Sequence, residues 1–544
     1  MSRTAVPSPR IQILKLEKKL FLENKAVINE TTQVADPGFK KYWRNYKKAI
    51  RTYQKVSDTE EITEAISRAR IILVGDYHTL DQSQRSFVRL LRSYFEANQD
   101  KKITVALEAV QSRFQKSLED FMLGKSDSET FIRRIGFKKH WFFDLWSNYE
   151  VVFDYLIYHH VPMVAIDADN RKKMTLFERD DFMAEKIVRL AEEFQDEKIF
   201  VLVGDLHLAS EHLPKAIKKL ASKKRLTLPI LTLYQNSPEI HWMLSEKGLV
   251  EHTDVVKIGP TEFCRQHTPP LIIQQSYLNW LTHEDDTFDW ADAKVSFLHL
   301  VSRIAEIIGL VLPKDCEEVE VYTCGDLGFL KTIKKKKLFS RSEFSFIKEQ
   351  VESSRSCYLS RARIAYIANV SLHHAAEEAA HYLKSLFCGE EFPRIRQDAF
   401  YAGILHEAAC FFGSKLVNPK RKCSRLLDFK KDVRYFSSLT PTSDQQLSLK
   451  TADLFIKHAS TVKSGKLIAS SQVANLSSEL FLWLVSAIGC DLGDHLYYGF
   501  MSGHIPKDII QALFTERFEE EGEPGKIYLS LVRMLQAVKR PPKI

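Results

Sequence analysis

Short apolar runs alternate with helical patterns between residues 70 and 234, and this alternation limits the fold more than any other feature of the chain. Four of the runs have the length and β-branched character of buried strands, and they cover residues 71–74, 103–107, 162–166 and 199–203. Two later runs, 228–233 and 255–258, are expected to extend the same sheet. Apolar strands separated by helices indicate a parallel sheet that is covered on both faces. We therefore predict an α/β fold with a doubly wound, mainly parallel sheet.

The chain has 544 residues and is expected to contain more than one domain, because a single hydrophobic core stops growing at about 250–300 residues. Residues 39–56 space tyrosines at helical intervals, and we assign residues 1–56 to an N-terminal helical extension. Residues 57–282 form the predicted α/β domain. Helical periodicity dominates residues 283–544, which we predict to be a second, mainly helical domain. Two short runs in this domain have strand character, 319–322 and 364–367.

The composition argues against several classes of protein. The net charge of +8 is modest for this length, and acidic and basic residues are mixed, so no nucleic-acid partner is expected. None of the eight cysteines has C-x-x-C spacing, which leaves a zinc-finger or redox motif without support and indicates reduced cysteines. The N-terminus lacks the pattern of an export signal, and no segment approaches the ~20 apolar residues of a membrane span. We expect a cytoplasmic protein.

Polar residues follow each of the four predicted strands. In open α/β sheets ligands bind outside the carboxyl ends of the strands, so these residues should share one site. The strands end in Gly75-Asp76-Tyr77-His78, in Glu108, in Asp167 followed by Asp169, and in Gly204-Asp205-Leu206-His207. Histidine nitrogens and carboxylate oxygens bind divalent metal ions and also act as general acids and bases. The sequence therefore predicts either a metal site or a hydrolytic site at this edge of the sheet.

A family resemblance covers residues 70–233. Its parts are Val74–His78 with Gln84, then Ala106–Glu108, then Gly136–Trp141 and Trp146–Tyr149 leading into Val161–Asp167, and finally Val203–His207 followed by Leu213–Pro214. In this order and spacing they resemble the ChaN-type domain of the haem-binding-uptake/Tiki superfamily, which also includes the erythromycin esterases and TraB-like proteins. The glutamate of the family's first motif is Asp76 here, one methylene shorter. Members of the family divide between haem or metal binding and metal-dependent hydrolysis.

The resemblance implies a pocket at the strand ends that binds haem, a metal ion or a small-molecule ligand. Three residues, His78, Glu108 and His207, are the expected metal ligands. The ligand-binding residues are expected to be Asp76, Tyr77, Tyr149, Asp167 and Asp205. A tyrosinate from Tyr77, Tyr149 or Tyr155 could bind ferric haem, with tryptophans as an apolar wall.

Two alternatives use the same fold differently. As a metal-dependent hydrolase, the protein would use His78, Glu108 and His207 as catalytic residues, with Asp76 or Asp205 orienting a histidine. As a non-catalytic scaffold, it would bind a protein partner through its helical C-terminal domain.

Histidines also occur on predicted helices of the C-terminal domain. One helix carries His374, Glu378 and His381 on one face, with the E-x-x-H spacing found in helical di-metal sites. The other polar residues considered are His406, Glu407, Asp491, Asp494 and His495. Because the E-x-x-H pattern occurs once rather than twice, we expect these groups to face solvent or interact locally, with a second metal site as the alternative.

Overall fold

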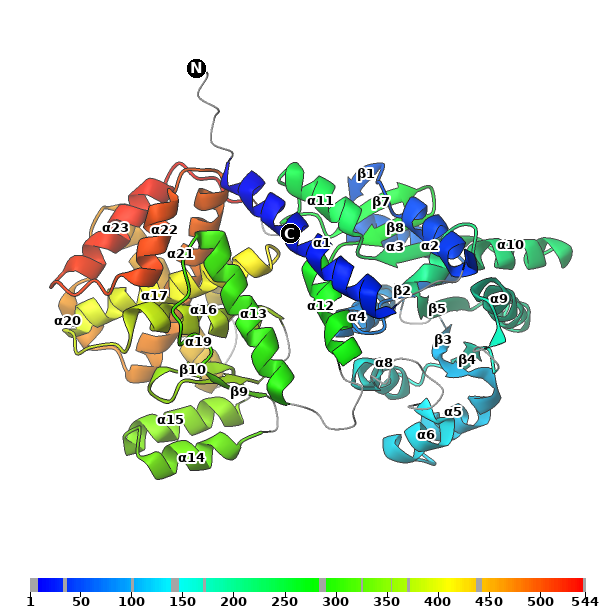
Figure 1. Cartoon of the computed structure of the whole chain (residues 1–544), viewed down its shortest axis with the longest axis horizontal. Coiled ribbons are helices and arrows are strands. Elements are labelled where there is room, and N and C mark those ends of the chain that lie inside the picture. The colour runs from blue at the N-terminus through cyan, green and yellow to red at the C-terminus, as the bar shows by residue number, and fades with distance from the viewer. Residues whose placement is uncertain are drawn as a thin grey trace, which may run out of the picture. The chain divides into compact units, whose positions relative to one another are not determined.

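The computed structural model describes residues 8–32, 37–98, 102–137, 146–169, 173–282, 290–323, 326–353, 355–368, 372–436 and 443–541 (Figure 1). The chain divides into two compact units. One unit, Glu17–Asp286, contains the large sheet and is called the α/β unit below. The other, Met1–Leu16 with Thr287–Ile544, is called the helical unit. No helix in the described ranges is both long enough and apolar enough to cross a membrane.

The α/β unit is built on an eight-stranded sheet with the order β1-β7-β8-β6-β2-β5-β3-β4. The strands are β1 (Lys55–Ser57), β2 (Ile71–Asp76), β3 (Ile103–Gln111), β4 (Met163–Asp167), β5 (Lys198–Gly204), β6 (Ile230–Gln235), β7 (Val255–Gly259) and β8 (Glu262–Arg265). The strands from β8 through β6, β2, β5 and β3 to β4 are parallel, while β7 runs antiparallel to β1 and β8. The predicted α/β fold class with a mainly parallel sheet is confirmed.

Alternate residues of the central strands enter two separate cores, one on each face of the sheet. Ile72 and Val74 of β2 lie in one core, whereas Ile71 and Leu73 lie in the other, as the two-residue period of a strand requires. The first core receives the helices α3 (Thr59–Arg68), α4 (Asp81–Ala97), α5 (Gln115–Met122), α6 (Ser128–Ile135) and α8 (Trp146–Tyr158). The second receives α2 (Pro37–Ala49), α9 (Leu176–Glu193), α10 (Leu213–Lys223) and α11 (Pro238–Glu246). Helices therefore cover both faces of the sheet.

The path of the chain reverses between β2 and β5. After β2 the chain crosses over β5 to reach β3, and after β5 it crosses over β2 to reach β6. The two strands are direct neighbours, with Asp76 paired to Gly204. Such a reversal is the topological switch point at which open α/β sheets bind ligands. The two G-D-x-H strand ends therefore lie side by side at this point.

The N-terminal segment differs in one respect from the predicted helix. Helix α2 ends at Ala49, and residues Lys55–Ser57 form the edge strand β1 instead of continuing the helix. Tyr42 and Tyr46 of α2 are buried. The tyrosine spacing predicted the buried face of the helix, while pairing with β7 determined where the helix gives way to a strand.

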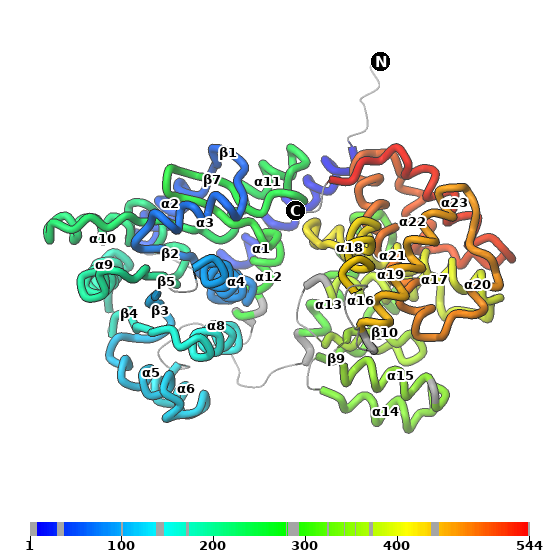
Figure 2. The backbone as a smooth tube through the Cα atoms, turned by 180° about the vertical axis from the view of Figure 1, so that it is seen from behind, coloured from blue at the N-terminus to red at the C-terminus, as the bar shows by residue number. Residues whose placement is uncertain are grey.

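The helical unit is built around α17 (Arg396–Val417). This helix packs against α16 (Leu372–Cys388) and α21 (Ser478–Met501) (Figures 1 and 2). Almost every residue of α17 from Phe400 onward is buried, as expected of a helix in the centre of a bundle. The remaining helices are α13 (Trp290–Ile308), α14 (Gly328–Lys336), α15 (Arg341–Glu352), α18 (Leu426–Phe436), α19 (Ser443–Lys463), α20 (Ser470–Ala474), α22 (Lys507–Thr515) and α23 (Glu523–Leu535). A small sheet of order β10-β11-β9 contains β9 (Glu320–Thr323), β10 (Cys357–Leu359) and β11 (Ile364–Ile367). Helix α1 (Pro9–Thr32) begins in this unit, and α12 (Pro270–Thr282) belongs to the α/β unit.

Candidate functional site

His78 follows β2 and is held in a fixed orientation by a carboxylate. Its Nδ1 lies 2.7 Å from Asp76 Oδ2 and 2.9 Å from the Tyr149 hydroxyl. The carboxylate of Asp76 also accepts hydrogen bonds from Tyr149 on α8 and from Gln84 on α4. Because Asp76 and Tyr149 both contact Nδ1, the other ring nitrogen of His78, Nε2, faces the backbone of β5 at Gly204. The side chain of His78 is 17% exposed, against 2% for Asp76.

His207 lies on the short 3₁₀ turn Asp205–Leu208 that follows β5, and a carboxylate holds it in the same way. Its Nδ1 is 2.6 Å from Asp180 Oδ1, on helix α9. Tyr42 of α2 donates a hydrogen bond to the other oxygen of Asp180, at 2.9 Å. The opposite ring nitrogen of His207, Nε2, lies 3.6 Å from Glu108 Oε1. The structure thus places His207 and Glu108 side by side.

Glu108 is nearly buried and lies beside an arginine that the sequence analysis did not name. Arg179 donates to Glu108 Oε1 at 2.5 Å and to Asp167 Oδ1 at 2.7 Å, and the backbone N–H of Gly204 donates to Glu108 Oε2 at 2.6 Å. Burial alone would raise the pKa of Glu108, but the charges of His207 and Arg179 outweigh it and hold that pKa well below its usual range. Glu108 is therefore an ionised carboxylate inside the protein.

Strand β3 is longer than predicted, since it continues past Glu108 to Gln111. Its pairing with β5 nevertheless ends at Leu107, opposite Leu202. Glu108 is thus the first residue of β3 beyond the shared ladder. This position allows its side chain to reach the end of β5.

Two glycines provide the space in which the strand ends meet. A Cβ on Gly204 would lie 3.1 Å from His78 Nε2 and 3.3 Å from Glu108 Oε2, so both side chains approach the backbone of β5 at this residue. A Cβ on Gly75 would lie only 1.7 Å from Asp205 Oδ1. Side chains at these two positions would displace the polar groups, which explains why glycine precedes each aspartate.

Asp205 does not orient a histidine, although it occupies the same motif position as Asp76. It accepts hydrogen bonds from the Tyr46 hydroxyl and from the backbone N–H of Gln235 at 3.0 Å. Burial raises the pKa of Asp205 to about 7 despite these bonds. The partner of His207 is instead Asp180, from a helix rather than a strand end.

The tyrosines considered as oxygen ligands are neutral phenols in this structure. Burial, followed by the charge of Asp76, raises the pKa of Tyr149, whose hydroxyl bonds to Asp76 and His78. Burial likewise raises the pKa of Tyr77. Tyr155 packs against the rings of Phe95 and His159, at the edge of one core. A tyrosinate ligand would require a ligand that displaces these contacts.

Two further residues named from the sequence have other roles or lie elsewhere. Asp169 accepts hydrogen bonds from Arg113 N at 2.9 Å and from the Ser112 hydroxyl, next to the strand end but outside the histidine cluster. Trp146 packs against Phe131 and Phe153 in the core. Trp141 lies outside the described residues.

The part of the α/β unit that carries the ends of β2, β3 and β4, but not that of β5, matches a known family. Residues 62–178 match the family described as haem-binding uptake, Tiki superfamily, ChaN. This region, the ChaN-like region below, includes Asp76, His78, Glu108, Tyr149 and Asp167, and it ends one residue before Arg179. The match does not extend into the helical unit.

One solved structure that resembles the chain is titled "Cofacial heme binding to ChaN of Campylobacter jejuni". The two sequences are 16% identical, and the alignment covers 35% of this chain and 90% of that one, with a TM-score of 0.27. No curated protein matches the chain.

The residues that complete the site come from helices next to the predicted strands. Arg179 and Asp180 follow the capping box Thr175–Glu178 that starts α9. Tyr42 and Tyr46 belong to the face of α2 that the sequence analysis had identified as apolar. One sequence signal could have identified Arg179 and Asp180, namely an Arg-Asp pair within the first turns of the helix after strand β4. The hydroxyl contacts of the tyrosines had no comparable local signal.

The arrangement around the ChaN-like region is acidic and suits a cation. The carboxylates are Asp76, Glu108, Asp167, Asp180 and Asp205, and the fixed positive charge among them is Arg179. Histidines that bind metals almost always donate their second ring nitrogen to a carboxylate or a carbonyl. Both His78 and His207 have this carboxylate. The side chains are therefore of the types that bind metal ions, although among the described residues the possible ligand atoms of His78, Glu108 and His207 do not all lie within 4.8 Å of one another.

Two of the polar residues that the sequence singled out in the helical unit form structural contacts. Asp494 is buried among Lys415, Arg425 and Arg540, with Lys415 Nζ at 2.7 Å, and forms a structural ion cluster. His495 Nε2 lies 3.0 Å from the carbonyl of Val538. These residues fix the packing of the C-terminal segment.

Proposed function

We propose that the edge of the sheet at the carboxyl ends of β2, β3 and β5 binds a metal centre, either as haem or as a divalent ion, through His78 and His207, with Glu108 beside His207. The observation that carries this proposal is the pair of carboxylate-held imidazoles on neighbouring strands, Asp76–His78 and Asp180–His207. A carboxylate on Nδ1 fixes the tautomer that makes Nε2 a metal ligand and increases its basicity. The family described as haem-binding uptake supports the same class of ligand.

The charge of the site supports a cationic centre. Arg179 balances only part of the negative charge, because it bonds to Glu108 and Asp167 at once. A bound ion would add the missing positive charge beside Glu108. His78 is the most exposed of the two histidines and Glu108, at 17% against 5% and 3%, so it is the ligand that an approaching haem or ion meets first.

The first experiment identifies the ligand. Elemental analysis of the protein as purified reports bound metal, and titration with ferric haem reports haem through its Soret band. We expect His78→Ala and His207→Ala each to weaken binding by tenfold or more, because loss of a ligand or its supporting partner costs at least that much. His159→Ala, an exposed histidine of the same unit, is the matched control. A wild-type protein that binds neither haem nor metal, or variants that bind as well as wild type, would refute the proposal.

A second candidate function is a metal-dependent hydrolase, and the two Asp–His pairs favour it. An aspartate that holds a histidine in the correct tautomer is also the arrangement of a general base. We expect a hydrolase to cleave p-nitrophenyl esters or phosphodiesters with added Mn²⁺ or Zn²⁺, and Asp180→Asn to lower kcat with little effect on KM. Rates equal to those of the His78→Ala/His207→Ala double variant would exclude this candidate.

If binding and hydrolysis are both absent, an interaction scaffold is the remaining reading, with the helical unit as the partner-binding part. We also place the protein in the cytoplasm. The seven cysteines among the described residues are all free, as expected in a reducing compartment.

A further inference from the structure

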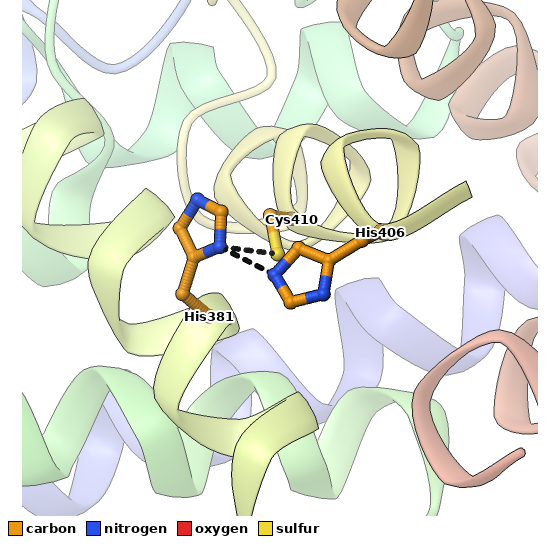
Figure 3. A group of neighbouring side chains, drawn as sticks. All are labelled: His381, His406 and Cys410. Atoms are coloured by element: carbon orange, nitrogen blue, oxygen red, sulfur yellow. Dashed lines mark hydrogen bonds between the residues drawn. The ribbon is translucent and has the colours of Figure 1, made fainter. Parts of the chain in front are cut away.

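A second group of possible metal ligands lies in the helical unit, between α16 and α17. Figure 3 shows the side chains of His381, His406 and Cys410 pointing toward one another. His381 Nδ1 lies 2.8 Å from His406 Nε2 and 3.2 Å from Cys410 Sγ. His406 and Cys410 are one turn apart on α17, so both project from the same face toward α16. Three potential ligand atoms thus meet at one point.

Within the described ranges, these are the residues whose potential ligand atoms all lie within 4.8 Å of one another in a group of three or more. The sequence had grouped His381 with His374 and Glu378 on its own helix. The structure joins it instead to residues of the neighbouring helix, including a cysteine that the sequence analysis had not considered.

Hydrogen bonding alone does not explain this convergence. In a neutral imidazole, Nδ1 has either one N–H or one lone pair, directed in the plane of the ring. The Nδ1 of His381 can therefore form one well-directed hydrogen bond, either with His406 or with Cys410 but not with both. A metal ion at the centre would bind all three atoms at once.

We propose that His381, His406 and Cys410 bind a divalent ion of the zinc class, with a fourth position left for water. Imidazole and thiolate are the ligands that zinc prefers in proteins. Bond lengths of about 2.0 Å to nitrogen and 2.3 Å to sulfur in a tetrahedral site place the nitrogens about 3.3 Å apart and nitrogen about 3.6 Å from sulfur. The two distances from His381 Nδ1, 2.8 Å to His406 Nε2 and 3.2 Å to Cys410 Sγ, would have to lengthen by only about half an ångström to reach this geometry.

Charged side chains of both signs lie near the cluster. The charged side chains that influence the cluster are Glu377, Glu378, Glu407, Lys384 and Arg421. Glu377 pairs with Arg421 at 2.7 Å, and Lys384 donates to the carbonyl of Leu513 at 2.7 Å. Burial raises the pKa of Glu378, and raises that of Glu407 to about 8. The attraction for an ion therefore comes from the three converging ligand atoms rather than from nearby carboxylates.

The three residues of the cluster differ in exposure. His381 and His406 are partly exposed, while Cys410 is buried behind them. Glu378 precedes His381 by three residues on α16, so it lies on the same face of that helix. Its carboxylate accepts a hydrogen bond from the backbone N–H of Tyr358 and is not one of the ligand atoms that lie within 4.8 Å of one another, so water is the fourth ligand that the cluster leaves room for.

Cobalt is the probe that tests the site, because a thiolate bound to Co²⁺ gives an intense near-ultraviolet absorption band. The full-length protein would be stripped with a chelator and titrated with Co²⁺, and then with Zn²⁺ in competition. We expect one equivalent of Co²⁺ with a thiolate band, which Zn²⁺ abolishes. Cys410→Ser should remove that band, and His381→Ala and His406→Ala should each weaken binding by tenfold or more.

Matched controls separate ligation from folding and from the ChaN-like region. Cys388→Ser and His374→Ala change a cysteine and a histidine of α16 outside the cluster, and should bind Co²⁺ as wild type does. The His78→Ala/His207→Ala double variant should retain the thiolate band, since the other histidine cluster has no cysteine. Cys410→Ala replaces Cys410→Ser if the serine variant does not fold, as judged by circular dichroism. No thiolate band in wild type, or an unchanged band in a folded Cys410 variant, would overturn the proposal.

Discussion

The protein contains two histidine clusters, and the buried carboxyl groups in or beside them differ in charge state. In the α/β unit each histidine is held by an aspartate, and an arginine keeps Glu108 ionised. In the helical unit the histidines face each other and a thiol, and burial raises the pKa of the nearby Glu407 to about 8. The charged side chain of Arg179 thus compensates part of the negative charge of the first cluster, while burial keeps Glu407 beside the second cluster protonated.

This difference has a physical origin in the elements that carry each cluster. Strand ends at a switch point bring backbone N–H groups and helix side chains close to a carboxylate, as Gly204 N and Arg179 show for Glu108. Two packed helices bond their own backbone groups internally and offer only side chains. A buried carboxyl group between helices therefore stays neutral unless a cation compensates it, as Lys415 does for Asp494.

The largest expected effect is the loss of Arg179. Arg179→Ala would leave Glu108 and Asp167 buried without their counter-ion, which costs about 3–5 kcal/mol of unfolding free energy. Urea unfolding measures this cost. Arg68→Ala removes an exposed helix pair with Glu64 and should cost at most about 0.5 kcal/mol. A loss below about 1 kcal/mol for Arg179→Ala would show that solvent already compensates the α/β cluster.

Next in size is the pH dependence of the helical cluster. The pKa of Glu407 rises from 4.5 to about 8 through burial and then the charge of Glu377, so its contribution to stability is intact below pH 4.5 and is lost as the pH rises to about 8. In chelator-treated protein, the free energy of unfolding of Glu407→Gln should exceed that of wild type by about 2 to 4 kcal/mol at pH 8. At pH 4.5 the two values should differ little.

The control for this measurement is Glu352→Gln, which changes an exposed glutamate of α15 that pairs with Lys348. That substitution should not stabilise the protein at pH 8. A Glu407→Gln variant without added stability at pH 8 would mean that Glu407 is ionised and compensated, as Glu108 is. The contrast between the two clusters would then fail.

A smaller effect distinguishes the two clusters by their ligands. Burial raises the pKa of the Cys410 thiol, so a metal ion must displace its proton. We expect Co²⁺ affinity at this cluster to rise about tenfold per pH unit between pH 6.5 and 7.5, as followed by the thiolate band. An affinity independent of pH would show that the thiol is not a ligand.

The smallest predicted effect concerns the outer support of His207. Tyr42→Phe removes the hydroxyl that donates to Asp180 and should cost about 1 kcal/mol of unfolding free energy. It should also weaken ligand binding at His207, which isothermal titration would detect. Tyr158→Phe alters a tyrosine that is 80% exposed and should have no effect. Equal behaviour of the two variants would show that the Tyr42 hydroxyl does not support the α/β cluster.

Local sequence patterns predicted the sheet and half of the site. The runs at 71–74, 103–107, 162–166 and 199–203 are β2, β3, β4 and β5, because a strand buried on both faces leaves a continuous apolar run. The short strands β1 and β8 were missed, since three or four residues carry too little periodicity. Glycine, aspartate and histidine after two strands marked both strand ends, because the polar residues must leave the core where the strand stops.

The sequence by itself therefore determined the parallel sheet and the residues at its carboxyl edge. Only the tertiary structure decided which side chains complete each cluster. Tyr42 and Asp180 are 138 residues apart, and no local pattern links them. His381 and Cys410 belong to different helices that meet only after packing. The two G-D-x-H motifs look equivalent in the chain, yet Asp76 holds a histidine and Asp205 binds Tyr46, because neighbouring helices offer different partners.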